Sequence, residues 1–291
     1  MWYLFTKLLL RSLSKRSCCI RVPGLSAPQD RTWSRVASEY ARISPPLRPS
    51  KEDVALFHHA TTGHASRVLL LGVTPALATF GTSLLAVEAI PAVIESLWIG
   101  NGPDRRAVAG DWRALPCPDR SCSAIIGDGA ISAADSNPVV LIREWLRVIE
   151  PEGVLAIRCF CAPSTAEQLD AIVSDAKEGQ IPDLNVLKWR LAMHLAAKDP
   201  DFRVPVTWVL SEFNRLFPDR RRLLDQTGWS LDQFAFVDQY LGSVVALRFL
   251  PERRLHECIA PLAAETSFLR PKGYPLAELS PILVMRGPKL V

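Results

Sequence analysis

The sequence has no apolar run of the 18 or more residues that a membrane-spanning helix requires, so we expect a soluble protein without a membrane span. It also lacks a basic stripe interleaved with aromatic residues, because the net charge is only +4 and the basic residues are spread along the chain. We therefore do not expect nucleic acid as a partner. The 291 residues, 48% hydrophobic, predict a globular protein with one substantial core.

Cysteine is too sparse to indicate a disulfide framework. The chain has seven cysteines, an odd number, and enough apolar segments to build a core without cross-links. This favours free thiols in a reducing compartment. Neither "CPDRSC" (Cys117, Cys122) nor "CFC" (Cys159, Cys161) has the spacing of a zinc site. We therefore expect no metal site, with Cys159 and Cys161 as small buried side chains of a strand.

Acidic residues are absent from the start of the chain until Asp30, while arginine, lysine and serine are frequent there. Such a basic, amphipathic start is typical of organelle transit peptides. A disordered basic leader, or a misassigned start codon, has the same composition. We expect residues 1–30 to be a disordered or targeting leader. The location is then cytoplasmic, or mitochondrial or another organelle if the leader is a transit peptide.

The remaining chain divides by its hydrophobic pattern. From Arg67, short apolar runs such as "RVLLLG" and "SAIIGDGA" alternate with helical segments. Strands that are apolar on both faces and alternate with helices indicate a parallel sheet covered on each side. We predict an α/β fold with a doubly wound, mostly parallel seven-stranded sheet. The expected parts are an N-terminal helical cover (31–66), a ligand-binding core (67–163), a helical insertion after the fifth strand that caps the substrate side (164–250), and a closing helix with two strands (251–291).

Glycines and acids recur where the predicted strands end. Gly72 follows the first strand and Glu88 ends the second, while "GDW" from Gly110 follows the third and "GDG" from Gly127 follows the fourth. Ligands of open α/β sheets bind beyond these carboxyl ends. In this order and spacing, the segments resemble the class I S-adenosylmethionine-dependent methyltransferases over Arg67–Pro163.

The resemblance implies a Rossmann-like fold, S-adenosylmethionine as the cofactor, and methyl transfer as the reaction. It implies that Glu88 binds both ribose hydroxyls, that Asp111 faces the adenine amino group, and that Trp112 packs on the adenine ring. The first turn passes under the methionine part, and the loop after the fourth strand lies near the methionine end and the substrate. The implied cofactor-binding residues are Leu71, Gly72, Val73, Thr74, Glu88, Gly110, Asp111, Trp112, Asp128 and Gly129.

Glu88 also has a physical argument of its own. A carboxylate at the end of the otherwise apolar strand "LLAVE" loses hydration unless something pairs with it. A vicinal diol offers two donors to its two oxygens, and charge-assisted hydrogen bonds of this kind contribute about 1.5–3 kcal/mol each. The alternative is a surface carboxylate that caps the following helix, "PAVIESLW".

The first turn departs from the family pattern. Leu71 stands where an acid is usual, and Thr74 and Pro75 replace glycines. We expect Pro75 to begin a helix in "TPALATFG" and Thr74 to cap it. The departure leaves a second interpretation open, a catalytically degenerate, methyltransferase-like binding or scaffold protein. A dinucleotide-dependent oxidoreductase is disfavoured, because the glycine fingerprint and a Tyr-x-x-x-Lys pair are both absent.

Methyl transfer depends mainly on holding two reactants in position, and a general base assists when the acceptor is a hydroxyl or a protonated amine. Asp128 is the candidate base by position, and His194 on the insertion is the second candidate. The enclosing insertion and the lack of a basic surface favour a small-molecule acceptor. "GDGA" in place of an "NPPY"-type loop disfavours methylation of nucleic-acid adenine. The sequence does not indicate an oligomeric state.

Overall fold

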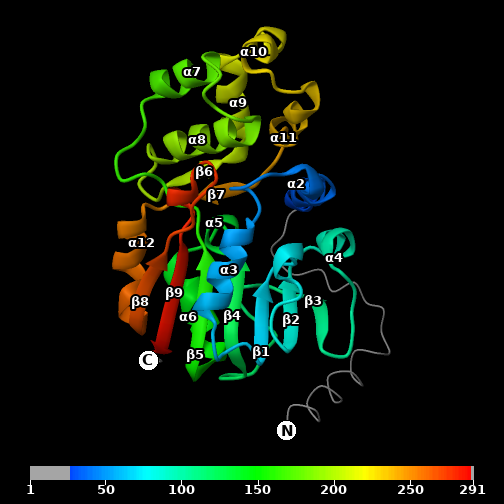
Figure 1. Cartoon of the computed structure of the whole chain (residues 1–291), viewed down its shortest axis with the longest axis vertical. Coiled ribbons are helices and arrows are strands. Elements are labelled where there is room, and N and C mark those ends of the chain that lie inside the picture. Colours follow the sequence, from blue (N-terminus) through cyan, green and yellow to red (C-terminus); the bar gives the residue numbers. More distant parts are fainter. Residues whose placement is uncertain (1–26, 290–291) are drawn as a thin grey trace.

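The computed structural model describes residues 27–289, so the predicted leader at 1–30 lies outside the described residues except for 27–30. A seven-stranded sheet with the order β3-β2-β1-β4-β5-β9-β8 forms the centre of the fold (Figure 1). Its strands are β1 (Arg67–Leu71), β2 (Ser83–Glu88), β3 (Arg105–Ala109), β4 (Cys122–Asp128), β5 (Ile149–Arg158), β8 (Ala263–Leu269) and β9 (Ile282–Pro288).

Strands β1 to β5 are parallel, and β9 runs antiparallel between β5 and β8. The register aligns Leu71 with Val87 on one side and with Gly127 on the other, so β1, β2 and β4 end at the same edge of the sheet. This confirms the predicted doubly wound, mostly parallel, seven-stranded sheet, and it places the polar groups that follow these strands along one edge.

Both faces of the sheet are covered by helices. Leu69 and Leu71 of β1 pack into the core beside α6 and α12, whereas Val68 and Leu70 pack into the core beside α3 and α4. Alternate side chains of a strand point to opposite faces, so a strand that is buried on both faces must be apolar throughout. The covering helices are α3 (Lys51–Ala60), α4 (Pro91–Leu97), α6 (Pro138–Val148) and α12 (Glu252–Ile259), with the short α5 (Ala130–Ala133) after β4.

The segment after β1 differs from the expected helix. Only a short 3₁₀ turn forms, Pro75–Leu77, and the Thr74 side chain makes no capping hydrogen bond. Leu77 is fully buried, and Gly81 takes a left-handed conformation that turns the chain toward β2. The expectation of a helix capped by Thr74 was wrong, because the chain turns back toward β2 at Gly81 directly after this short 3₁₀ turn.

Residues after β5 form a layer with its own apolar core, built around Trp189, Phe213 and Phe249. In Figure 1 this layer lies above the carboxyl ends of the parallel strands. It also contains a two-stranded antiparallel ribbon, β6–β7, which was not predicted because strands of three residues show no periodicity. The elements are α7 (Leu169–Lys177), α8 (Leu184–Ala196), β6 (Arg203–Pro205), α9 (Val206–Leu216), α10 (Arg220–Thr227), α11 (Ala235–Asp238) and β7 (Ala246–Arg248).

Helix α2 (Ala27–Ser38) lies between this layer and the sheet (Figure 1). It contacts α4, and Thr32 donates a hydrogen bond to Ser243 of the layer above (2.8 Å). Between residues 27 and 289, no helix is long and apolar enough to cross a bilayer.

Candidate cofactor site

A cavity of about 330 Å³ opens at the carboxyl ends of β1, β2 and β4. Its volume lies in the range of roughly 300–1,000 Å³ that is usual for small-molecule sites. Segments far apart in the sequence form its wall, so only the fold brings them together. The residues expected to bind the cofactor that line this cavity are Leu71, Gly72, Val73, Thr74, Glu88, Asp111, Trp112 and Asp128.

Glu88 ends β2 with its carboxylate directed toward the first turn. A Cβ atom built on Gly72 would lie 3.8 Å from Oε2, while Oε1 accepts a hydrogen bond from the backbone N–H of Ile90 (3.0 Å). Burial raises the pKa of Glu88 to about 7, against the lowering effect of backbone hydrogen bonds from Ile90 and Ala89. The carboxylate thus both contacts the start of α4 and faces the cavity. The two sequence-based interpretations of Glu88 are therefore compatible.

The first turn retains the one glycine that its backbone requires. Gly72 has φ +89°, a conformation that residues with a side chain rarely adopt. Its N–H donates to the carbonyl of Val87 (2.8 Å), which fixes the end of β1 against β2. Of the two positions where glycines are missing, Thr74 directly precedes the 3₁₀ turn with φ −52° and Pro75 begins it, so residues with side chains fit both. The turn therefore keeps an open approach at Gly72 without the usual glycine repeat.

Asp111 and Trp112 follow β3 and reach the same cavity. The indole N–H of Trp112 donates to the carbonyl of Val87 (2.7 Å), and its Cζ2 lies 3.6 Å from the position of a Cβ on Gly72. Asp111 accepts hydrogen bonds from the side chain and the backbone N–H of Arg113. Burial alone raises the pKa of Asp111, but the hydrogen bonds and charge of Arg113 outweigh it and hold the pKa below its ordinary value. Arg113 thus occupies much of the hydrogen-bonding capacity that was predicted to serve adenine.

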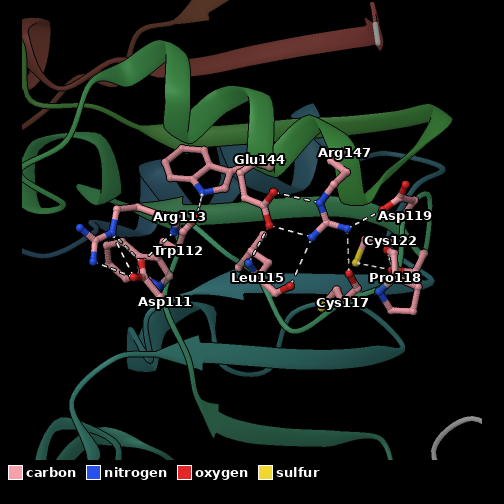
Figure 2. Close-up of polar contacts among 12 residues, drawn as sticks. Asp111, Trp112, Arg113, Leu115, Cys117, Pro118, Asp119, Cys122, Glu144 and Arg147 are labelled. Carbon is pink, nitrogen blue, oxygen red and sulfur yellow. Dashed lines mark hydrogen bonds and ion pairs between the residues drawn. The ribbon is translucent and has the colours of Figure 1, made fainter. Parts of the chain in front are cut away.

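Helix α6 holds the loop that presents Asp111 and Trp112 (Figure 2). The indole N–H of Trp145 donates to the carbonyl of Trp112 (2.9 Å), and Glu144 accepts from the N–H of Leu115 (2.6 Å). Arg147 donates to the carbonyl of Cys117 (3.0 Å) and pairs with Glu144 (2.7 Å). These bonds satisfy backbone groups of a loop that has no ladder partners of its own.

Asp128 belongs to a buried charge network. Its Oδ1 accepts a hydrogen bond from Nε of Arg158 (2.7 Å), whose guanidinium also lies 3.5 Å from Asp53 and donates to the carbonyl of Pro46 (2.7 Å). Tyr274 donates to Asp53 (2.9 Å). Burial raises the pKa of Asp128, although the nearby Arg158 opposes this effect. One oxygen of the candidate base is therefore already held by a guanidinium at the edge of the cavity.

The remaining predicted residues, Gly110, Gly129 and His194, do not line this cavity. Gly110 donates its N–H to the carbonyl of Glu88 (3.0 Å) and positions the loop without lining the cavity. Gly129 lines a second cavity adjacent to the first. His194 lines neither cavity, and its Nδ1 lies 2.8 Å from the carbonyl oxygen of Glu167. Cys159 and Cys161 are buried, as expected, but they follow β5, which ends at Arg158, and are not part of a strand.

Several residues of the site were missed in the sequence. Helix α2 contributes Trp33 to the cavity wall. Tyr40, which follows α2 in the chain, also lines the cavity. The hydroxyl of Tyr40 is buried, and it has no hydrogen-bond partner among residues 27–289. The spacing of Trp33, Val36, Ala37 and Tyr40 is that of one apolar helix face, a signal that was available. Arg158 interrupts the apolar run "VLAIRCF", and this was also a signal that something must pair with it.

No protein-family model matches the sequence, and no curated protein resembles it significantly. Solved structures do resemble the fold. A candidate zinc-dependent alcohol dehydrogenase from Rhodobacter sphaeroides is 10% identical, with a TM-score of 0.56 over 90% of this chain and 100% of that one. A candidate S-adenosylmethionine-dependent methyltransferase from Methanococcus maripaludis is 14% identical, with a TM-score of 0.43 over 92% and 97% of the two chains.

A third similar structure is the candidate methyltransferase from Haloferax volcanii in complex with a methyltransferase activator, which is 10% identical with a TM-score of 0.47 over 89% and 96% of the two chains. At these identities the likeness concerns the fold, so the names of these proteins do not carry their chemistry to this chain. Among residues 27–289, no three His, Cys, Asp or Glu side chains are grouped as a metal site. The chain has a Rossmann-like fold, with a doubly wound, mostly parallel seven-stranded sheet and a glycine-poor first turn.

Proposed function

We propose that the protein binds S-adenosylmethionine in the cavity at the carboxyl ends of β1, β2 and β4 and transfers its methyl group to a small-molecule acceptor. The observation that carries the proposal is the carboxylate of Glu88, directed toward Gly72 in a cavity that Asp111 and Trp112 also line. A partly desolvated carboxylate beside an open glycine suits a ribose diol, because the diol supplies the donors that water no longer provides.

The residues of the cavity divide the binding task by their chemistry. Glu88 accepts hydrogen bonds from the two ribose hydroxyls, and the indole of Trp112 offers an apolar face to the adenine. The turn Leu71–Thr74 supports the methionine part, and Asp128 lies where this cavity meets the next. When bound, the cofactor supplies a methyl group activated by a sulfonium. The chain has to orient the reactants and exclude water, which alone can contribute effective molarities of ~10⁵ to 10⁸ M.

A second candidate is a methyltransferase-like binding protein without catalysis. Two observations favour it: Arg113 occupies Asp111, and Arg158 holds Asp128 in an ion pair, so both acids are less free than in the predicted site. Both candidates bind the cofactor, but only the methyltransferase transfers its methyl group.

Isothermal titration calorimetry with S-adenosylmethionine and with its demethylated product tests the proposal. We expect both to bind, and we expect Glu88→Ala to weaken binding by about tenfold or more, on the scale of ~1.4 kcal/mol per decade. Glu95→Ala is the matched control, because Glu95 is an exposed carboxylate on the helix that follows Glu88. Absence of heat at millimolar ligand, or equal affinity of the wild type and a folded Glu88→Ala variant, would reject the cofactor site.

A further inference from the structure

A second cavity, of about 130 Å³, lies between the sheet and the layer above it. It shares Trp33, Val36, Ile43, Leu47, Asp128 and Ala133 with the first cavity, so the two are neighbours along a common wall. Its volume is close to the roughly 150 Å³ of an engineered protein cavity that binds benzene. A single aromatic ring with a small substituent therefore matches its size.

Five aromatic side chains line this second cavity, together with aliphatic and polar ones. Phe160 and Trp189 meet edge to face with their ring centroids 5.3 Å apart. Phe236 and Tyr240 also line it, on and just after α11. Aromatic walls favour a flat, apolar ligand, since edge-to-face and stacked contacts add to the burial of the ring.

One cationic side chain, Lys188 on α8, lies in this aromatic cavity. Its Nζ lies 5.1 Å from the ring centroid of Tyr240 and 5.8 Å from that of Trp189, and the side chain is only 4% exposed. The amine donates to the carbonyl of Phe236 (3.0 Å), and within the described chain no carboxylate forms an ion pair with it. Burial lowers the pKa of Lys188 to about 7, with the charge of Asp183 opposing the shift.

Asn185 precedes Lys188 by one helical turn and lines the same cavity. It is 2% exposed, and its Oδ1 has no hydrogen-bond partner in residues 27–289. An unsatisfied buried acceptor costs free energy unless a donor reaches it. The cavity therefore presents a buried amine and a free amide oxygen on one helix face, both among aromatic rings, which is the pattern of a ligand site.

We propose, on the basis of the proposed methyltransferase function, that this second cavity is the acceptor site and that it binds a small aromatic ring carrying an acidic hydroxyl, held by Lys188 and Asn185. On binding, the O–H bond of the ligand breaks and its proton passes to the neutral amine of Lys188. A phenolate oxygen then lies beside an ammonium, with total charge unchanged.

Other ligand classes fit the cavity less well. A protonated amine would repel the ammonium form of Lys188, and it would lose the hydration of its own charge on entering the cavity. A carboxylic acid is already ionised in water, so it would lose the hydration of a full charge on entering aromatic walls. A phenol enters neutral and ionises only beside the amine, which avoids that cost. The phenolate oxygen is more nucleophilic than the hydroxyl of the neutral phenol, and it lies in the cavity that adjoins the cofactor cavity.

The probe is 4-nitrophenol, whose phenolate is yellow and whose neutral form is not. We expect the phenolate band to grow when the full-length protein is added to the phenol near pH 7, where much of the Lys188 amine is neutral. Lys188→Met should remove this band and weaken binding by about tenfold to a hundredfold. Lys198→Met is the matched control, because Lys198 is exposed just after α8 and lines neither cavity. Nitrobenzene, which has no hydroxyl, should bind the wild type and Lys188→Met equally.

Calorimetry with S-adenosylmethionine on the same preparations separates this inference from the proposed function. Lys188 lies outside the first cavity, so the folded Lys188→Met variant should retain cofactor affinity. A wild-type protein that binds the cofactor but not 4-nitrophenol, or a phenolate band that persists in Lys188→Met, would overturn the acceptor assignment. If Lys188→Met fails to fold, Asn185→Leu serves as the second variant, and unchanged affinity for 4-nitrophenol there would equally overturn it. A wild-type protein that binds 4-nitrophenol through Lys188 but binds no cofactor would reject the proposed function instead.

Discussion

Glu88 allows a prediction about stability that is separate from ligand binding. Its pKa is raised from 4.5 to about 7 by burial, so the folded protein holds a proton that the unfolded chain releases. Below pH 4.5 both states are protonated and the group has no effect on stability. Between pH 4.5 and 7 the unfolding free energy falls, and above pH 7 the folded state is destabilised by up to about 3 kcal/mol. Glu88→Gln, which has no charge to bury, should remove this penalty.

The measurement is urea unfolding of the wild type and Glu88→Gln at several pH values from 5 to 9, without ligand. We expect a difference of about 1 kcal/mol in favour of Glu88→Gln at pH 5, which grows to about 3 kcal/mol by pH 8. Glu95→Gln should follow the wild type at every pH, since its carboxylate is exposed. The same Glu88→Gln variant should bind S-adenosylmethionine more weakly, which would show that the carboxylate is retained for function at the expense of stability. Parallel pH curves for the wild type and Glu88→Gln would refute the reasoning, because they would mean that the carboxylate is hydrated.

Three further predictions concern the buried groups around the two cavities. Arg158→Met leaves Asp53 and Asp128 buried without their guanidinium, and should lower the unfolding free energy by about 3–5 kcal/mol in urea titrations; a loss below 1 kcal/mol would contradict the buried network. Gly129→Ala places a Cβ 2.6 Å from the ring of Phe160, and should lower the unfolding free energy by about 2 kcal/mol more than Gly242→Ala. Both glycines are left-handed, but a Cβ on Gly242 meets open space. Equal losses in urea titrations would mean that the ring of Phe160 moves aside. Lys188→Met should unfold with a free energy about 3–5 kcal/mol higher than the wild type near pH 7, because the lowered pKa of Lys188 destabilises the folded state as pH falls from 10.5 to 7. In urea titrations this difference should shrink toward pH 10. A difference that does not change with pH would show that the amine is hydrated.

The helices after β5 show what a sequence pattern does not predict, namely which side chains line a cavity. Lys188 and Trp189 belong to a helix that is buried nearly all round, so no polar face distinguishes the lysine from its neighbours. His194 on this helix was the second candidate base, and Arg190 precedes it by one helical turn. In the structure Arg190 pairs with Glu167 and Asp175, away from both cavities. Helical spacing identifies side chains on a common face, but it does not identify what that face contacts.

The sequence by itself determined the sheet and the order of the polar strand ends. The apolar runs that form β1, β2 and β4 are buried on both faces, and such strands must be covered by helices whatever the rest of the chain does. Parallel strands end at one edge, so Gly72, Glu88, Asp111 and Asp128 could be expected to meet before any coordinates were known. The role of Gly72 could be anticipated too, because a residue without a side chain at a strand end lets the backbone approach a ligand closely.

Only the tertiary structure decided which of these groups are free to meet a ligand. Arg113 closes on Asp111 and Arg158 on Asp128, and the second of these contacts joins residues 30 positions apart. The second cavity combines α8 and α11 with α2, which lies more than a hundred residues before them in the sequence. The pairing of charges and the closing of a cavity depend on distances in space, and a sequence pattern records only distances along the chain.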